Sequence, residues 1–229
     1  MQNPEFVHAA FSAIAPRYVA ANHVLSLGID LAWRQRVVQR VAEWKPARLL
    51  DIATGTGDLA LALNKALPEI DMLATDFCQP MLNVARRRGL THLLCADAMN
   101  LPLADASFDA ATVAFGLRNM ADYAAALREF ERILKPGGHL LILDFSMPGG
   151  WLAAPYRWYL HHVLPSVAGW ITHRPEAYTY LGDSIETFPR GEAMLRLLAE
   201  QGYEDAAAEP LNGGIACIYT AERACPSSE

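Results

Sequence analysis

The chain has 229 residues, enough for one large domain with a sizeable hydrophobic core. Hydrophobic residues make up 52% and charged residues 19%, a composition typical of globular proteins and not of disordered ones. The formal net charge of -6 argues against a surface that binds duplex nucleic acid, so we expect no nucleic-acid partner.

Cysteine usage and the N-terminus bear on the compartment. The four cysteines form no C-x-x-C pair, so we expect no metal site and favour a reducing compartment. The N-terminus lacks the basic stretch and apolar core of a signal peptide. No stretch reaches the roughly 18 uninterrupted apolar residues of a membrane span. We therefore expect a cytoplasmic protein.

Hydrophobic spacing in chain order predicts an α/β fold. Residues 5–44 are expected to form two helices, the second with Val37, Val38 and Val41 on one face and ended by Pro46. Apolar runs then alternate with helical patterns, which predicts a doubly wound, mostly parallel sheet covered on both faces, a Rossmann-like arrangement. The expected strands are 47–53, 70–76, 92–97, 108–117 and 139–146, and the expected helices are 57–67, 79–89 and 122–135.

The third of these helices carries an apolar stripe, and Pro136-Gly137-Gly138 after it predicts a turn. The residues of the stripe are Tyr123, Ala126, Leu127, Phe130, Ile133 and Leu134. Residues 149–188 then break the rhythm, because they are rich in Trp and Tyr and show no strand signal, so we interpret them as a helical insertion. A helix at 190–201 and strands near 203–209 and 214–221 are expected to complete the domain.

The stretch LLDIATGTGDLALAL at residues 49–63 predicts a strand, a glycine turn and a helix. Gly55-Thr56-Gly57 and Ala60 fit G-x-G-x-x-A, a pattern that is weak on its own. A P-loop is excluded because Asp58 follows the second glycine, where it would oppose a phosphate at the helix N-terminus. A dinucleotide is allowed by the spacing to Asp76, but two carboxylates beside the turn, Asp51 and Asp58, oppose a pyrophosphate.

S-adenosylmethionine suits this turn better than a dinucleotide. It carries an ammonium and a sulfonium and has no phosphate, and glycines let the backbone approach it closely. Asp76 is placed to accept hydrogen bonds from both ribose hydroxyls, and Asp97-Ala98 follows the third strand, where an adenine contact would lie. The predicted cofactor-binding residues are Asp51, Gly55, Thr56, Gly57, Asp76, Phe77, Asp97 and Ala98.

Each acid also has a structural alternative. Asp51 could be a helix-cap partner or a partly satisfied core carboxylate. Asp76 could be the N-cap of the helix that starts near Gln79, and Asp97 could be a turn former.

Three motifs in this order resemble those of class I methyltransferases that use S-adenosylmethionine: LLDIATGTGD, DAMNLPLADASFD and ERILKPGGHLLILDFS. Over nearly the whole chain, further stretches such as FSAIAPRYVAANHVLSLGIDLAW, AYTYLGDSIETFP and LNGGIACIYTAER resemble the ubiquinone/menaquinone biosynthesis C-methyltransferase family. Its members methylate a ring carbon of a polyprenylated quinol. Matches to its early motif are Tyr18, Asn22, Ser26 and Trp33, and departures from its motifs are Val19, Ala21, Asp30 and Asp144. The stretch SLGID slightly favours the menaquinone branch.

The chemistry implied by this resemblance needs a stabilised phenolate beside the ring carbon. Arg118-Asn119 follows the fourth strand, at the edge where ligands of such folds bind. We predict that Arg118 stabilises the phenolate, directly or through a water, and that Asn119 orients the ring. The alternative is that Arg118 pairs with Asp122 at a helix start.

The resemblance implies further substrate-binding residues, and ordinary packing is their alternative. These residues are Tyr18, Asn22, Tyr178, Tyr180 and Ser184. His23, His161 and His162 could act as bases, although a lone histidine is more often structural.

The aromatic segment 149–172 has two interpretations. It could be a lid that shelters the prenyl tail and touches the inner face of the membrane. It could instead pack on the core or on a second subunit, as a homodimer would require. Four parts of one domain are therefore expected: an N-terminal helical cap (1–45), a cofactor-binding core (46–148), a substrate-covering insertion (149–188) and a C-terminal helix and strands (189–223).

Three rival functions remain open at this point. The first is a methyltransferase for another small aromatic or lipid acceptor. The second is a non-catalytic module that binds S-adenosylmethionine, and the third is a dinucleotide-dependent oxidoreductase.

Overall fold

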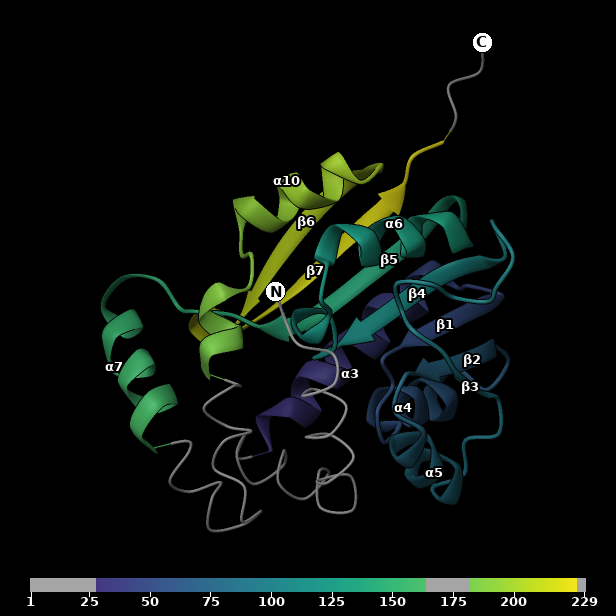
Figure 1. The fold of residues 1–229 in the computed structure, drawn as a ribbon, viewed down its shortest axis with the longest axis horizontal. Helices are drawn as coiled ribbons and strands as arrows, with labels where there is room; N and C mark the ends of the chain where they lie inside the picture. The colour runs from purple at the N-terminus through teal and green to yellow at the C-terminus, as the bar shows by residue number, and fades with distance from the viewer. Residues whose placement is uncertain (1–27, 164–181, 226–229) are drawn as a thin grey trace.

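A seven-stranded sheet forms the centre of the computed structural model, which describes residues 28–163 and 182–225 (Figure 1). The strand order is β3-β2-β1-β4-β5-β7-β6. The first five strands run parallel, and β7 is antiparallel to both β5 and β6. The strands are β1 Arg48–Ile52, β2 Asp71–Asp76, β3 Leu93–Cys95, β4 Phe108–Ala114, β5 Leu134–Phe145, β6 Tyr203–Leu211 and β7 Ala216–Arg223. The predicted doubly wound, mostly parallel sheet is confirmed.

Helices cover both faces of the sheet, as the alternating pattern predicted. On one face, Val37 and Val41 of α3 pack with Leu63 of α4 against β1, β4 and β5. On the other face, Phe130 of α6 and Leu198 of α10 belong to one cluster with residues of β4, β5 and β7. The long helices are α3 Ile29–Trp44, α4 Asp58–Ala66, α5 Gln79–Arg87, α6 Tyr123–Ile133 and α10 Glu192–Glu200. Burial of these apolar stripes stabilises the layers.

The strand order places a switch point between β1 and β4. From β1 the chain moves outward to β2 and β3, and it then returns to the other side of β1 with β4. The loops that leave the carboxyl ends of β1 and β4 therefore diverge to opposite sides, which opens a crevice between them. The glycine turn after β1 and Arg118-Asn119 after β4 both lie at this edge.

One local prediction is wrong. Leu134 is not the last residue of the α6 stripe but the first residue of β5, and Pro136-Gly137-Gly138 lies inside that strand and not in a separate turn. The register explains how the strand accommodates them: Phe108 pairs with Leu134, whereas Ala110 pairs with His139. The three residues form a bulge, which Gly137 permits because its φ is 72°.

The described part of the aromatic insertion is helical, as predicted. It comprises η2 Gly150–Leu152, α7 Ala153–Trp158 and the π-helical turn η3 Tyr159–Val163, with a further helical stretch at 182–187. In Figure 1, α7 stands away from the sheet, beyond the carboxyl end of β5. Residues 164–181 of the insertion lie outside the described residues. Within the described ranges, no helix combines the length and apolar character needed to cross a bilayer.

Candidate functional site

The glycine turn joins β1 to α4 through left-handed backbone. Gly57 has a φ of 84°, and a Cβ at this position would come within 2.5 Å of Leu90 Cδ1. The left-handed backbone favours glycine here, and a larger residue would also have to displace the Leu90 side chain. Ala53, which precedes the turn, also has a positive φ, of 52°. Strained backbone of this kind is concentrated at functional sites.

Asp76 at the end of β2 closes the turn from the side. Its Oδ2 accepts the N–H of Gly55 at 2.8 Å, and its Oδ1 accepts the N–H of Cys78 at 2.8 Å. The alternative in which Asp76 caps α5 is wrong, because Cys78 occupies the N-cap position. A carboxylate has about four lone-pair sites, so Asp76 can also accept from a diol in the pocket.

Asp51 lies beneath the turn and is almost completely buried. It pairs in register with Thr112 of β4, so the two side chains share a face of the sheet, and Thr112 Oγ1 donates to Asp51 Oδ1 at 2.6 Å. Asp51 Oδ2 has no hydrogen-bond partner among the described residues. Burial raises the pKa of Asp51 from 3.8 to about 6, against the opposing effect of the Thr112 hydrogen bond. The interpretation of Asp51 as a partly satisfied carboxylate is thus confirmed.

Asp58, the first residue of α4, is an acid with several partners. Arg88 Nη1 donates to its Oδ1 at 2.6 Å, and Thr56 Oγ1 donates to its Oδ2 at 3.2 Å. Arg34 of α3 approaches Oδ2 to 3.8 Å. The negative charge beside the turn is therefore partly balanced from α3 and from the end of α5.

The pocket at the switch point gathers most of the predicted cofactor residues. Asp51, Gly55, Thr56, Asp76 and Phe77 line it, together with Asn119 from the loop after β4. Gly57, Asp97 and Ala98 are not part of its lining. The lining also contains residues that the sequence analysis did not assign: Arg34, Ala53, Thr54, Asp58, Leu59, Met81, Ala114, Phe115 and Gly116. Phe115 and Gly116 could have been found, because they directly follow β4 at the switch point.

Asp97 follows β3 and shapes the next loop. Its Oδ1 accepts the N–H of Met99 at 2.9 Å, and its carbonyl accepts the N–H of Asn100 at 3.0 Å. The alternative of a turn former is confirmed, while the predicted adenine contact of Asp97 and Ala98 stays a prediction.

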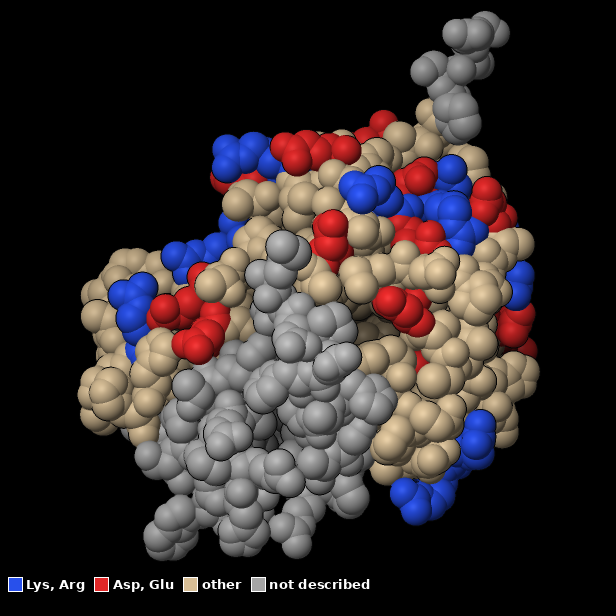
Figure 2. Space-filling model, viewed as in Figure 1, with Lys and Arg blue, Asp and Glu red and all other residues tan. Residues whose placement is uncertain are grey.

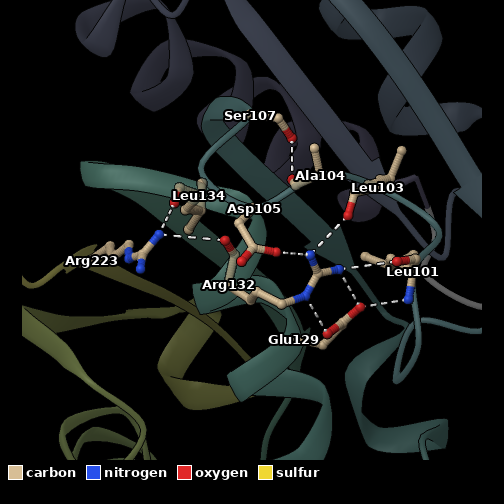
Figure 3. Close-up of polar contacts among 9 residues, drawn as sticks. All are labelled: Leu101, Leu103, Ala104, Asp105, Ser107, Glu129, Arg132, Leu134 and Arg223. Atoms are coloured by element: carbon tan, nitrogen blue, oxygen red, sulfur yellow. Dashed lines mark hydrogen bonds and ion pairs between the residues drawn. The ribbon is translucent and has the colours of Figure 1, made fainter.

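Arg132 of α6 fastens the far end of this loop (Figure 3). It donates to the carbonyls of Leu103 and Leu101 at 2.8 and 3.0 Å, and it forms ion pairs with Asp105 and Glu129 at 2.5 and 2.7 Å. Glu129 in turn accepts the N–H of Leu101 at 2.6 Å. These contacts fix residues 101–105 against α6.

Arg118 does not form the alternative pair with Asp122, and its predicted catalytic role stays a prediction. It is 3% exposed, and its Nη1 donates to Asp144 Oδ1 and to the Phe115 carbonyl, each at 2.6 Å. Its ion pair is with Asp144 of β5 and not with Asp122, whose carboxylate instead caps α6 by accepting the N–H of Ala125. Burial raises the pKa of the Asp144 carboxyl, and the Arg118 charge opposes that rise. Arg118 itself is not part of the pocket lining, whereas its neighbour Asn119 is.

The predicted substrate residues are only partly described. Ser184 is buried in the helical stretch 182–187, beside Ile185, and does not line the pocket. Tyr18, Asn22, Tyr178, Tyr180 and His23 lie outside the described residues. His161 contacts Glu186 at 3.2 Å, and the ring of His162 stacks on Trp158 with a centroid distance of 5.6 Å. Both histidines therefore have structural contacts.

A sulfonium ligand fits this pocket by charge and shape. Three carboxylates line it, of which Asp51 has an oxygen without a partner in the described structure. The turn residues Thr54, Gly55 and Thr56 line the pocket as well, so a ligand would lie next to the backbone of the turn. A pyrophosphate would face the same carboxylates with like charge.

Comparison with known proteins decides the family. The model of the ubiE/COQ5 methyltransferase family matches residues 1–223. The chain belongs to this family. It is 47% identical over 219 residues to the demethylmenaquinone methyltransferase of Thermus thermophilus, covering 93% of this chain and 99% of that one. It is 42% identical over 222 residues to the ubiquinone/menaquinone biosynthesis C-methyltransferase UbiE of Syntrophotalea carbinolica, covering 94% of this chain and 93% of that one.

A solved structure shows the same fold in a more distant protein. Human N-acetylserotonin methyltransferase in complex with S-adenosylmethionine superposes with a TM-score of 0.63 at 17% identity, over 94% of this chain and 59% of that one. The family member described here is an S-adenosylmethionine-dependent methyltransferase of the class I fold. The oxidoreductase and non-catalytic alternatives are therefore wrong.

Proposed function

We propose that this methyltransferase transfers a methyl group from S-adenosylmethionine to a ring carbon of a polyprenylated quinol. The observation that carries the proposal is the family match over residues 1–223, with relatives named for demethylmenaquinone and for ubiquinone/menaquinone methylation. The acidic pocket at the switch point supports it independently. Demethylmenaquinol is the preferred acceptor in this proposal, because the most similar relative reported above bears that name.

Different residues of the site bind different parts of the cofactor. Asp76 accepts from the ribose hydroxyls, because its carboxylate faces the pocket while its two backbone contacts hold it still. Asp51 and the backbone of the turn bind the amino acid end, and Asp97-Ala98 borders the adenine. S-adenosylmethionine, when bound, supplies an electrophilic methyl group on its sulfonium. The residues of the chain bind and orient the cofactor and the acceptor, and they exclude water from the site.

Arg118 and Asn119 carry the catalytic part of the proposal. Ring-carbon methylation requires the neighbouring hydroxyl to lose its proton, so a cation close to the resulting phenolate lowers the barrier. Arg118 is fixed by Asp144 and by the Phe115 carbonyl, and Asn119 donates to the same carbonyl at 3.1 Å. This arrangement keeps a buried positive charge close to the pocket without large motion. A water between Arg118 and the phenolate is consistent with its place outside the lining.

The substrate-covering parts are proposed on resemblance. Tyr18, Asn22, Tyr178, Tyr180 and Ser184 would contact the quinol from the N-terminal cap and the insertion. Ser184 packs next to Ile185, which clusters with Met147 and Leu160, so it belongs to the wall that the insertion builds beyond β5.

Peripheral membrane contact is the second part of the proposal. Trp151 and Trp158 of the insertion are 84% and 60% exposed, although large aromatic side chains are usually buried. Indole rings favour the bilayer interface, next to the hydrocarbon interior in which a polyprenyl tail dissolves. A homodimer that covers the same tryptophans is the competing explanation.

The acceptor is tested by parallel turnover assays. Purified enzyme receives S-adenosylmethionine with either reduced demethylmenaquinone or the quinol precursor of ubiquinone, and the products are weighed by mass spectrometry. We expect a higher kcat/KM with demethylmenaquinol. A preference for the ubiquinone precursor would reassign the branch, and turnover only with other small aromatic or lipid acceptors would overturn the quinol proposal.

A further inference from the structure

The acidic pocket is bordered by a cationic side chain, that of Arg34. Arg34 of α3 is 6% exposed and lines the pocket beside Asp51, Asp58 and Asp76. The other lining residues in the described part of the chain are acidic or uncharged. The amino acid end of the methyl donor carries an ammonium and also a carboxylate. The acidic lining suits the ammonium but leaves the carboxylate without a counterpart.

The Arg34 guanidinium has one occupied edge and one open edge. Nη1 donates to Asp30, one helical turn earlier. Nε is buried and has no hydrogen-bond partner among the described residues. Nη2 lies 3.8 Å from Asp58 Oδ2, which is longer than a hydrogen bond. A buried N–H without a partner costs free energy, so this edge is poised for an acceptor.

Neighbouring groups hold Arg34 in place without using the open edge. Asp58 forms an ion pair with Arg88 at 2.6 Å and accepts a hydrogen bond from Thr56 at 3.2 Å, so its charge is balanced without Arg34. The Arg34 Cζ lies 5.8 Å from the centroid of the Phe115 ring, which is itself part of the lining. Orientation by Asp30 and by this ring lowers the entropy lost when a ligand binds.

We infer that Arg34 binds the carboxylate of the methionine moiety of S-adenosylmethionine through Nε and Nη2. The two N–H groups of a guanidinium edge match the two oxygens of a carboxylate. The inference rests on the methyl-donor assignment and adds a residue from outside the glycine-turn motifs. It makes α3 part of the cofactor site and not only a cover for the sheet.

The test is a comparison of two ligands without any quinol present. Isothermal titration measures the Kd of S-adenosylmethionine and of decarboxylated S-adenosylmethionine, which lacks only the carboxylate. Wild-type protein is expected to bind the complete ligand about 10- to 100-fold more tightly, as charged hydrogen bonds imply. Arg34→Gln should weaken binding of the complete ligand by a similar factor and leave the decarboxylated ligand within about twofold.

The control is a second arginine of the same helix. Arg36→Gln removes a cation from the same helix that contacts Glu209 at 2.7 Å, and it should retain the full preference. Equal loss of both ligands in Arg34→Gln would overturn the inference, because a merely structural role predicts it. If Arg34→Gln does not fold, Arg34→Lys is measured instead, because lysine keeps the positive charge but lacks the two N–H groups of the guanidinium edge. A Lys variant that prefers the complete ligand as strongly as wild-type protein does would also overturn the inference. Quinol turnover is measured separately, so failure here leaves the proposed reaction standing.

Discussion

Two buried carboxylates at the carboxyl edge of the sheet are held in opposite ways. Asp144 at the end of β5 has a full ion pair with Arg118 at 2.6 Å. Asp51 at the end of β1 accepts from the hydroxyl of Thr112, forms no ion pair with a described residue and keeps one oxygen without a partner among those residues. A buried charge without a counter-charge is destabilising, so Asp51 is retained at a cost to the fold. A cationic ligand would offset that cost.

Asp51→Asn should therefore stabilise the cofactor-free protein. The carboxyl titrates at about 6 in the fold and at 3.8 when unfolded, so the folded state binds more protons between these values. Stability falls as pH rises from 3.8 to about 6 and stays at its lowest above that. The difference corresponds to roughly 3 kcal/mol, which the variant should regain at pH 8 and not at pH 4.

Denaturant unfolding at both pH values measures this effect, with Asp71→Asn, at the exposed first position of β2, as the control. The affinity of wild-type protein for S-adenosylmethionine should rise as pH increases through about 6, because the ionised carboxylate attracts the ammonium. That rise should be absent in Asp51→Asn. A variant that is less stable at pH 8, or that keeps the pH dependence of binding, would contradict this role.

Replacement of Arg118 should reduce the chemical step and spare cofactor binding. Arg118→Lys keeps a charge for Asp144 but cannot reproduce the guanidinium contacts to Asp144 and the Phe115 carbonyl. We expect kcat to fall about 100-fold, in line with the loss of one stabilising donor, and the Kd of S-adenosylmethionine to change less than twofold. Arg118→Ala should lower kcat further and also lower stability, because it leaves Asp144 buried without its partner.

Single-turnover kinetics at saturating S-adenosylmethionine, scaled to the folded fraction, separate these effects. Arg128→Gln, at an exposed position of α6, is the matched control. Full kcat per folded Arg118→Lys molecule would show that the pair with Asp144 is only structural.

At the scale of elements, α6 positions the loop that follows β3. Arg132 connects the carbonyls of Leu101 and Leu103 with Asp105 and Glu129 (Figure 3). The Glu129 hydrogen bond raises the pKa of Arg132, so the cation is present at every working pH. The loop begins at Asp97, which is proposed to border the adenine. A rigid anchor at its far end therefore favours cofactor binding.

Arg132→Gln should loosen this loop. Removal of several charged hydrogen bonds is expected to lower stability by about 1–3 kcal/mol and to weaken S-adenosylmethionine binding by about 3- to 10-fold. The kcat at saturating cofactor should stay within about twofold, because the reacting centre is not touched. Hydrogen exchange of residues 97–105, measured beside the KM, tests the cause. Unchanged hydrogen exchange together with a higher KM for S-adenosylmethionine would contradict a loosened loop as the cause.

The elements could be predicted because their signals are local. The spacing of Val37 and Val41, or of Phe130 and Ile133, marks the buried face of a helix without knowledge of its partners. The same spacing led to the wrong placement of Leu134, since a leucine that opens a strand fits the end of a helical stripe equally well. The bulge at Gly137 depends on pairing with β4, a long-range contact that a local pattern does not contain.

The site residues that follow from the order of the strands were predicted, and those that depend on long-range packing were not. Asp51 and Asp76 lie at the carboxyl ends of β1 and β2, and the glycines follow β1, so topology alone brings them to one edge. Arg34 was not assigned, because its place beside the turn depends on how α3 packs against α4. The partner of Arg118 was also missed, since Asp144 is adjacent only after β4 and β5 have paired.

At the scale of the whole molecule, charges and aromatic residues are distributed unevenly. On the face shown in Figure 2, acidic and basic side chains alternate over α6 and α10 and form no continuous basic stripe. The exposed tryptophans, Trp151 and Trp158, lie on residues 150–158 beyond β5, where Arg157 pairs with Glu186. These two indole rings are the feature on which the proposed contact with an apolar partner rests.

Replacement of both tryptophans should weaken membrane contact alone. Trp151→Ser with Trp158→Ser is expected to lower the fraction that sediments with phosphatidylglycerol and phosphatidylethanolamine vesicles about fivefold or more, since two interfacial anchors are lost. Stability should change by less than about 0.5 kcal/mol per site, as for other exposed positions. Light scattering in solution is measured in parallel. A dimer that dissociates in this variant, with no vesicle binding by wild-type protein, would instead assign the surface to self-association.

The identity of the bond that is formed tests the proposed reaction most directly. Enzyme is incubated with S-adenosylmethionine labelled with ¹³C in its methyl group and with reduced demethylmenaquinone, and the product is examined by mass spectrometry and carbon NMR. We predict one labelled methyl group on a ring carbon, with product formation strongly reduced in Arg118→Lys. A labelled methyl ether on a hydroxyl oxygen, or no product despite measured cofactor binding, would contradict the proposed reaction.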